Sequence, residues 1–155
     1  MVLTREEAVA WAARLRGQGF RLIFTNGVFD LLHPGHIRYL RDARRLGDVM
    51  IVALNSDRSA RALAKGPNRP INTAAERAEV LTALACVDAT TIFDEDTPHA
   101  IVTALQPEVL VKGADWAEGT IVGADIVEAR GGRVVRIPLA EGYSTTRLIE
   151  KARRA

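Results

Sequence analysis

The sequence has one cysteine, Cys86, among its 155 residues, so the chain cannot form an internal disulfide. Cys86 lies in an apolar run and is expected to fill core space, which is typical of a protein in a reducing compartment. No apolar run approaches the ~20 residues of a membrane-spanning helix, and no signal peptide is recognisable. These absences predict a cytoplasmic protein without a membrane segment.

Aromatic residues are scarce and the charges are nearly balanced. Four phenylalanines, two tryptophans and two tyrosines are the only aromatic side chains, and the formal net charge is +2. So few aromatics argue against a base-stacking platform, and so small a charge does not indicate a polyanionic partner. The basic residues at 151–154 are interpreted as a last helical turn, where cations complement the helix dipole. We therefore expect no nucleic-acid partner.

Short apolar segments alternate regularly with helical patterns along the chain. The patterns predict strands near 21–25, 49–54, 90–93, 109–112 and 133–137. They predict helices near 5–16, 35–46, 57–64, 74–85 and 121–130, and from 97 and 145 onward. Repeated β-α units with short links favour a parallel sheet with helices on both faces. We expect one Rossmann-like α/β domain over 1–155, with a short N-terminal helix at 4–16 and a five-stranded parallel sheet.

Capping patterns mark several helix starts. Thr4 with Glu7, and Thr73 with Glu76, have the spacing of capping boxes. Pro98 is expected at the first position of its helix, where the missing N–H has no intrahelical partner to lose.

Polar residues follow the predicted strands at the points where the strands end. In a parallel sheet these carboxyl ends meet at one edge, and ligands bind in a crevice there. The polar segments are 25–27, 55–57, 112–116 and 144–146. The sequence therefore predicts a ligand site built from these four segments.

The segment 25–36 is the most informative part of this edge. His33 and His36 lie three residues apart at a helix start, so both face the same way beside the unpaired N–H groups of the first turn. N–H groups, the helix dipole and imidazole donors suit a polyphosphate. Pro34 presets the helix entry and Gly35 permits close approach of a ligand. Two alternatives are a metal-binding pair and two surface histidines that cap the helix.

With the preceding Asn-Gly-x-Phe-Asp, this motif resembles the His-x-Gly-His signature of a nucleotidyltransferase superfamily. The resemblance implies an enzyme that joins a nucleoside monophosphate unit to a phosphorylated acceptor, with His33 and His36 as catalytic residues. In the superfamily a Ser-Thr-Thr or Ser-Ser-Thr motif holds the triphosphate opposite the histidines. This chain has Ser144, Thr145 and Thr146 at a helix start, and three hydroxyls are more than an N-cap alone requires.

Lys65 lies in a loop at 65–70 that contains two prolines and a glycine. Loops of this kind can close over phosphates and exclude water, although a surface lysine can also serve solubility alone. Resemblance to the cytidylyltransferase-like branch of the superfamily implies a phosphate-binding, catalytic role for Lys65. Arg69 belongs to the same loop and is expected at the substrate.

Three further residues have two interpretations each. Arg77 either reaches the substrate or pairs with neighbouring glutamates on a wet surface. Asp30 either fixes backbone N–H groups or accepts a hydrogen bond from a sugar hydroxyl. Trp116, which follows Asp115, either binds ribose or base or covers a core edge.

The expected chemistry needs no general base, because a sugar phosphate is already a dianion near neutral pH. It can attack the α-phosphorus of a nucleoside triphosphate if it is held in line and the developing charge is neutralised. His33, His36 and Lys65 can supply that charge together with Mg²⁺. The sequence shows no acidic cluster for a protein metal site, so Mg²⁺ is expected to be held mainly by the nucleotide phosphates.

Over residues 24–148 the chain resembles adenylyltransferases that act on D-glycero-β-D-manno-heptose 1-phosphate. The motifs that carry the resemblance are at 25–30, 52–57, 69–72, 111–116 and 142–146. The resemblance implies ATP and a sugar 1-phosphate as substrates, with pyrophosphate and an ADP-heptose for lipopolysaccharide core as products. It also implies pairing into a homodimer and a separate sugar kinase upstream.

The implied contacts fall into two sets, and neither contains a metal ligand. The nucleotide-binding residues are Thr25, Asn26, Gly27, Phe29, Gly35, Asn55, Asp57, Lys112, Gly113, Asp115, Ser144, Thr145 and Thr146. The substrate-binding residues are Asp30, Arg69 and Arg77.

Other activities remain as alternatives. Glycerol-phosphate cytidylyltransferases carry Arg-Thr-Glu-Gly before their Ser-Thr-Thr, whereas this chain has Leu-Ala-Glu-Gly at 139–142. The missing arginine argues against glycerol 3-phosphate, but only the resemblance separates ATP from CTP. A cytidylyltransferase for another phosphorylated alcohol and a non-catalytic nucleotide-binding module stay open. A dinucleotide-binding oxidoreductase would need Gly-x-Gly-x-x-Gly after the first strand, which this sequence lacks.

Overall fold

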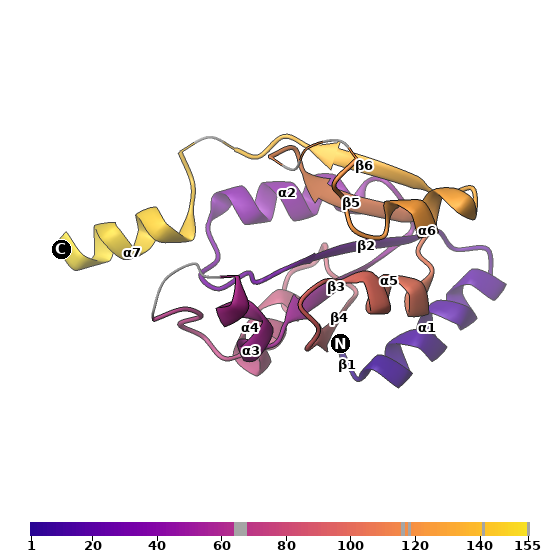
Figure 1. The fold of residues 1–155 in the computed structure, drawn as a ribbon, viewed down its shortest axis with the longest axis horizontal. Coiled ribbons are helices and arrows are strands. Elements are labelled where there is room, and N and C mark those ends of the chain that lie inside the picture. The colour runs from indigo at the N-terminus through magenta and orange to yellow at the C-terminus, as the bar shows by residue number, and fades with distance from the viewer. Residues whose placement is uncertain (64–67, 116, 118, 141, 155) are drawn as a thin grey trace.

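A computed structural model of the protein describes residues 1–63, 68–115, 117, 119–140 and 142–154. It contains one six-stranded parallel sheet in the order β1-β4-β3-β2-β5-β6 (Figure 1). The strands are β1 (Val2–Leu3), β2 (Leu22–Gly27), β3 (Val49–Asn55), β4 (Ala89–Phe93), β5 (Val109–Gly113) and β6 (Arg133–Ile137). The helices are α1 (Arg5–Gly17), α2 (Pro34–Arg44), α3 (Asp57–Ala62), α4 (Ala74–Thr82), α5 (His99–Leu105), α6 (Ala124–Ala129) and α7 (Thr145–Arg154).

The sheet has one strand more than the sequence predicted. The additional strand, β1, has two residues and pairs at the sheet edge with β4, with Val2 opposite Thr90 and Leu3 opposite Thr91. Two residues are too few for an alternating or continuous apolar pattern to be recognised. The five predicted strands are confirmed, and the prediction of a five-stranded sheet was short by this edge strand.

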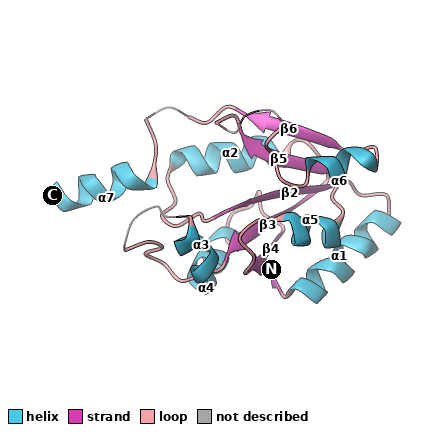
Figure 2. Ribbon diagram, in the orientation of Figure 1, coloured by secondary structure: helices cyan, strands magenta, loops and turns pink. Residues whose placement is uncertain are grey.

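Helices cover both faces of the sheet, as Figure 2 shows. On one face α1, α5 and α6 contribute buried side chains such as Trp11, Ile101 and Val127. On the other face α2 and α4 contribute Leu40 and Leu81. Residues 50–54 of β3 are all buried, because this strand lies between two neighbours and under helices on both sides. This double burial accounts for its continuous apolar sequence.

Local signals placed most helix starts to within two residues, whereas α6 starts at Ala124, three residues after its predicted start near 121. Both predicted capping boxes are present, Thr4 with Glu7 and Thr73 with Glu76. Helix α4 ends at Thr82, before the predicted end near residue 85, and Cys86 is half-buried against the core beyond it. Pro98 precedes α5 in the N-cap position instead of standing inside its first turn.

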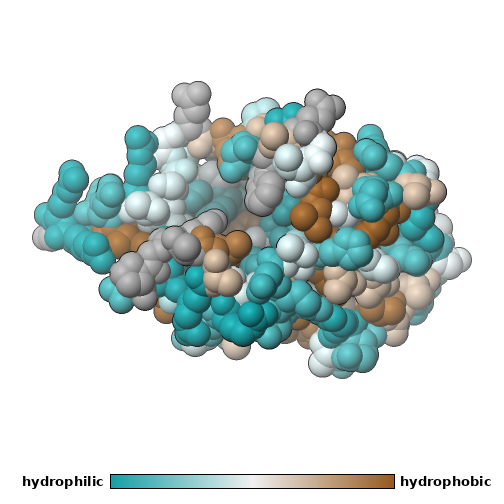
Figure 3. Space-filling model, in the orientation of Figure 1, coloured by the Kyte–Doolittle hydropathy of each residue, from teal (hydrophilic) through white to brown (hydrophobic). Residues whose placement is uncertain are grey.

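One face of the molecule is seen in the space-filling view. On the face shown in Figure 3, hydrophilic residues predominate and apolar ones form small separate groups. Within the described residues, no helix combines the length and apolar character needed to cross a membrane.

The order in which strands are added reverses at the centre of the sheet. From β2 the chain adds β3 and β4 on one side, and it then returns to add β5 and β6 on the other side of β2. Such a switch point opens a crevice beyond the carboxyl ends of the strands. Residues that follow Gly27, Asn55 and Gly113 therefore face a common space.

Candidate active site

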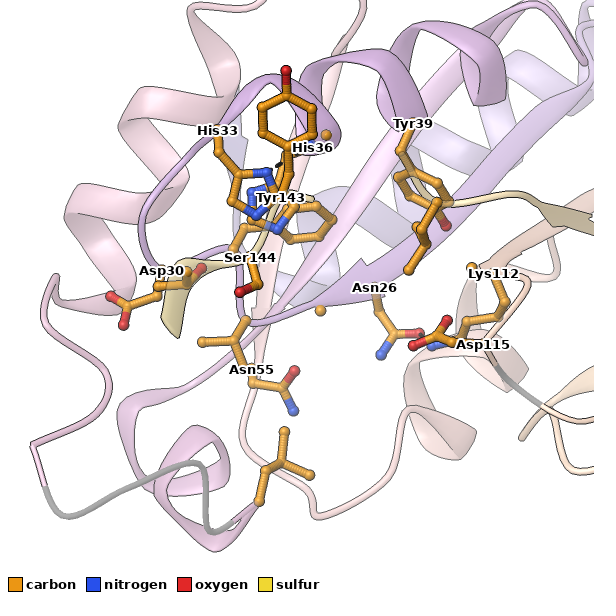
Figure 4. A pocket seen from close by; sticks show the side chains of 18 of the residues that line it. Asn26, Asp30, His33, His36, Tyr39, Asn55, Lys112, Asp115, Tyr143 and Ser144 are labelled. Carbon is orange, nitrogen blue, oxygen red and sulfur yellow. Dashed lines mark hydrogen bonds between the residues drawn. The ribbon is translucent and has the colours of Figure 1, made fainter. Parts of the chain in front are cut away.

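A cavity of about 720 Å³ lies at the carboxyl ends of β2, β3 and β5 (Figure 4). Most residues predicted for the site line it. They are Asn26, Gly27, Phe29, Asp30, His33, Gly35, His36, Asn55, Arg69, Lys112, Gly113, Asp115, Ser144, Thr145 and Thr146. Lys65 and Trp116 lie outside the described residues. Segments far apart in the sequence thus meet where the parallel-sheet rule placed them.

His33 and His36 stand at the first turn of α2. His33 is the N-cap residue, and its Nδ1 accepts a hydrogen bond from the backbone N–H of His36 at 3.3 Å. The two imidazole rings stack with centroids 3.8 Å apart and planes 16° from parallel. Because Nδ1 of His33 is an acceptor, the proton of the neutral ring is on Nε2, which can donate to a ligand.

The electrostatics of this turn suit an anion. Burial lowers the pKa of His33, so that the ring is readily neutral in the ligand-free protein. Because the rings are stacked, a positive charge on both of them at once would be unfavourable through mutual repulsion. A polyphosphate between the ring edges and the first N–H groups of α2 would relieve that repulsion.

Phe29 joins the end of β2 to this turn. Its φ is +48°, a left-handed conformation that is rare for a bulky residue. Its ring lies 5.2 Å from that of His36, at 56° to it. A Cβ atom built at Gly27 would stand 3.0 Å from the Phe29 ring, so the absence of a side chain at Gly27 lets the ring fold back over the strand. Strained residues of this kind often occur at ligand sites.

Asp30 anchors the segment 69–72. Its carboxylate accepts the backbone N–H of Ile71 at 2.8 Å and of Asn72 at 3.0 Å, and Nε of Arg69 at 2.6 Å. Burial alone would raise the pKa of Asp30, but the donors from Asn72, Ile71 and Arg69 outweigh it and hold the pKa below its ordinary value. The first of the two interpretations, binding of backbone N–H groups, describes this geometry. A contact with sugar stays a prediction.

Arg77 lies beneath the cavity and does not line it. Its side chain is fully buried and donates to the carbonyls of Val28 at 2.6 Å and Asn55 at 2.9 Å, and to Asp57 at 2.8 Å. A further bond runs to the carbonyl of Asn72 at 3.1 Å. This place differs from both interpretations, because Arg77 contacts neither the cavity nor a wet surface. It ties together three segments that surround the site, at Val28, at 55–57 and at Asn72.

Thr25 and Asp57 do not line the cavity, although both were predicted to contact nucleotide, and that contact stays a prediction. Thr25 is buried and its hydroxyl bonds to the phenol of Tyr39 at 2.7 Å. Burial raises the pKa of Tyr39 well above its ordinary value, so the phenol stays neutral. The carboxylate of Asp57 accepts a hydrogen bond from the guanidinium of Arg77. The structure therefore gives these two residues supporting places.

A second polar group lies on the floor of the cavity, at the ends of β2 and β5. Lys112 is buried, and its Nζ donates to Oδ1 of Asn26 at 2.5 Å. The carboxylate of Asp115 folds over Gly113, where a Cβ atom would stand 2.5 Å from Oδ1 of Asp115. The absence of a side chain at Gly113 thus leaves room for the carboxylate of Asp115, which lines the cavity (Figure 4).

Ser144, Thr145 and Thr146 enter from the C-terminal segment. Oγ of Ser144 accepts the backbone N–H of Arg147 at 3.1 Å, which is the N-cap contact of α7. The hydroxyl of Thr145 donates to the carbonyl of Leu31 at 3.3 Å and so joins α7 to the loop before α2. All three residues line the cavity with the histidines. Ser144 therefore acts as a cap, and the segment still faces the same space as α2.

Two aromatic residues at this site were not assigned from the sequence. Tyr39 lies one helical turn after His36, lines the cavity and bonds through its hydroxyl to the buried Thr25. Tyr143 stands at the cavity rim directly before the three hydroxyl residues. The position of Tyr143 next to a recognised motif was the available signal.

The donor set favours phosphate over a protein-bound metal. Among the described residues, no group of three or more His, Cys, Asp or Glu side chains could hold a metal ion. The cavity offers imidazole N–H groups, hydroxyls, an ammonium group and a helix N-terminus, which all bind phosphate oxygens. A Mg²⁺ ion held by the phosphates themselves stays a prediction.

The chain is similar to known proteins over nearly its whole length. Residues 24–151 match the family model described as cytidylyltransferase-like. A bifunctional protein HldE from Syntrophotalea carbinolica is 53% identical over 136 residues, covering 88% of this chain and 28% of that protein. A bifunctional protein HldE from Koribacter versatilis is 53% identical over 150 residues, covering 97% of this chain and 31% of that protein. The chain thus spans less than a third of the length of these relatives.

Solved structures share the fold. A lipopolysaccharide core biosynthesis protein from Thermoplasma volcanium superposes with a TM-score of 0.69 at 28% identity, over 79% of this chain and 100% of that one. A pantothenate synthetase from Thermus thermophilus gives a TM-score of 0.64 at 17% identity, over 99% of this chain and 70% of that one. At that identity the second likeness concerns the fold alone.

Proposed function

Because this chain belongs to the cytidylyltransferase-like family of nucleotidyltransferases, we propose that it transfers AMP from ATP to D-glycero-β-D-manno-heptose 1-phosphate. The products are an ADP-heptose and pyrophosphate. The observation that carries the proposal is the meeting of His33, His36 and the first turn of α2 with Ser144–Thr146 in one cavity. The similarity to the bifunctional HldE proteins and the motif resemblance at 25–30, 69–72 and 142–146 support the choice of acceptor.

The residues present can carry out this transfer without a general base. The phosphate dianion of the acceptor attacks the α-phosphorus, the bond to the β-phosphate oxygen breaks, and pyrophosphate leaves in line. Nε2–H of His33, the His36 ring and the N–H groups of α2 donate to the oxygens on which charge develops. Ser144–Thr146 bind the remaining phosphates from the other side. Bound Mg²⁺ supplies further neutralisation of phosphate charge.

The nucleotide base and ribose are assigned to the floor of the cavity, where Asn26, Lys112 and Asp115 lie. The sugar phosphate is assigned to the side formed by Asp30 and Arg69. The buried ion pair of these two residues gives that side a fixed shape. Arg69 also lines the cavity, so its guanidinium is available to a phosphate bound there. ATP is preferred over CTP in this proposal because of the motif resemblance alone.

The supply of the acceptor is part of the proposal. A sugar 1-phosphate carries its phosphate on the anomeric hydroxyl, and we propose that a separate sugar kinase attaches it before this enzyme acts. The relatives are named bifunctional and are about three times as long as this chain, which supports a link between the two reactions. Pairing into a homodimer also stays a prediction, and sedimentation equilibrium would test it.

The test is pyrophosphate release from four substrate pairs, which combine heptose 1-phosphate or glycerol 3-phosphate with ATP or CTP. We expect the heptose phosphate with ATP to be fastest. A preference for glycerol 3-phosphate with CTP would replace the proposal with glycerol-phosphate cytidylyltransferase activity. ATP binding by calorimetry without pyrophosphate release from any pair would identify a non-catalytic module. A fifth reaction, ATP without acceptor, controls for hydrolysis.

A further inference from the structure

Tyr143 bridges the two halves of the proposed phosphate site. Its ring lies 6.1 Å from the His33 ring and 19° from parallel with it. On the same ring, Cζ of Arg38 lies 5.4 Å from the centroid, in the range of a cation–π contact. Figure 4 shows the ring beside both histidines, with its hydroxyl directed away from Asn26 and Lys112.

The backbone of α2 is shaped to receive Tyr143. A Cβ atom at Gly35 would stand 3.1 Å from Cβ of Tyr143 and 3.0 Å from Nδ1 of His33. Both distances are tighter than ordinary van der Waals contact, and one of them is to the root of a side chain that cannot swing away. Gly35 therefore allows the segment immediately before α7 to approach the first turn of α2.

Helix α7 has little else to hold it against the domain. None of its residues is buried, and in Figure 1 it extends away from the sheet and the other helices. The bond from Thr145 to the carbonyl of Leu31, at 3.3 Å, is long and weak. Yet the start of α7 carries the hydroxyls that must face the histidines. Their placement consequently depends on the residue that packs immediately before them.

We propose that Tyr143 is a positioning residue, which with Arg38 holds Ser144–Thr146 opposite His33 and keeps the His33 ring aligned. The phosphate ligand in this inference rests on the proposed function, whereas the positioning role rests on the contacts of Tyr143 with His33, Gly35 and Arg38. Holding the segment in place before the ligand arrives removes an ordering cost from nucleotide binding. The phenol hydroxyl takes no part, so phenylalanine preserves the role and alanine removes it.

Phe20 offers a matched control. Its side chain is 42% exposed, as is that of Tyr143, and it precedes β2 at the opposite end of the strand from the cavity. We compare Tyr143→Ala, Tyr143→Phe and Phe20→Ala in the full chain. Tyr143→Ala is expected to raise KM for ATP about tenfold, with kcat changing less, since the loss falls on binding of the phosphates. Tyr143→Phe restores KM to near the parent value, and Phe20→Ala leaves KM unchanged.

A second measurement does not depend on turnover. Backbone hydrogen exchange of the peptide 143–150 is expected to be several times faster in Tyr143→Ala than in the parent or in Tyr143→Phe. Arg38→Ala should give part of this effect, and the double variant less than the sum of the two. Equal exchange in Tyr143→Ala and the parent would overturn the inference, as would a Tyr143→Phe variant as impaired as Tyr143→Ala. If no substrate pair releases pyrophosphate, the proposed function fails, while the exchange result still decides the role of Tyr143.

Discussion

Asp30 and Arg69 form an ion pair in which Oδ2 of the carboxylate lies 2.6 Å from Nε of the guanidinium. The Asp30 side chain is fully buried and that of Arg69 is 13% exposed. The same carboxylate accepts two backbone N–H groups, from Ile71 and Asn72. One buried charge therefore joins the loop before α2 to the segment before α4, and both border the cavity.

Asp30→Ala is expected to lower the free energy of unfolding by about 3 kcal/mol, because it leaves a nearly buried guanidinium and two N–H groups without their acceptor. Asp42→Ala is the control, since Asp42 pairs with Arg45 on the exposed face of α2 and such pairs contribute about 0.5 kcal/mol or less. Urea unfolding of both variants measures the difference. Similar small losses in the two variants would contradict the anchoring role.

The lowered pKa of Asp30 predicts that the free energy of unfolding depends on pH in the acidic range. Its pKa is lower in the folded protein than in the unfolded chain, so the unfolded chain binds more protons as the pH falls. The stabilisation is complete above the unfolded pKa of about 3.9 and is lost as the pH falls through the lower, folded pKa. Asp30→Asn should therefore flatten the acid limb of the stability curve. An unchanged limb in denaturant titrations at pH 5, 4 and 3 would show that other carboxylates dominate.

His36→Ala is expected to reduce turnover by about 10²-fold or more, the scale of a lost donor to a transition state. The fold should persist, because the N-cap contact is made by the His33 side chain to the backbone of residue 36. His99→Ala serves as the control, since His99 begins α5 on the surface. Pyrophosphate release and circular dichroism give the two readouts. Near-normal turnover in His36→Ala would refute the catalytic assignment.

Nucleotide binding is expected to take up protons. Burial lowers the pKa of His33 in the ligand-free protein, whereas a triphosphate beside the ring stabilises its charged form and raises that pKa. Between the two pKa values binding is therefore accompanied by protonation, and affinity for ATP increases as the pH falls. Calorimetry in buffers of different ionisation enthalpy counts the protons. The uptake should disappear in His33→Gln, and an uptake that persists there would assign it to another group.

Lys65→Ala is expected to lower kcat by about 10²-fold, as for loss of a charged donor to the phosphates. Lys65 lies outside the described residues, so the prediction depends on its sequence position and on the family resemblance. Lys151→Ala, on the exposed last turns of α7, is the control for loss of one positive charge. An unchanged kcat in Lys65→Ala would leave that residue as a surface lysine.

The layout of the cavity was predictable because one rule connects sequence to space. Parallel strands all end at the same edge, so Asn26, Asn55 and Lys112 had to meet once their strands were recognised. The starts of α1 and α4 followed from capping boxes, which involve only neighbouring residues. The strand β1 was missed because its pairing with β4 is remote in sequence and only two residues long.

The depth of each side chain was not predictable in the same way. Thr25 and Asn26 are adjacent in the sequence. The hydroxyl of Thr25 is buried against Tyr39, whereas Asn26 lines the cavity. Arg77 occupies an interior position that a sequence pattern reserves for apolar residues, because the carbonyls of Val28 and Asn55, both remote in sequence, converge on it with that of the nearby Asn72. Such convergence is a property of the tertiary fold. The edge at which the site residues gather therefore followed from the sequence, whereas the buried places of Thr25 and Arg77 depend on the tertiary fold.

The bond between Lys112 and Asn26 decides the chemical polarity of the cavity floor. The two ends of an asparagine amide have nearly the same shape but opposite hydrogen-bonding character. An ammonium group can only donate, so it fixes the oxygen end of Asn26 and leaves the NH₂ end as the donor of that amide. A nucleotide that contacts Asn26, as the proposed function predicts, is therefore expected to present an acceptor to it. With methionine in place of Lys112 the amide could rotate, and the floor would no longer distinguish a carbonyl or ring nitrogen from an amino group.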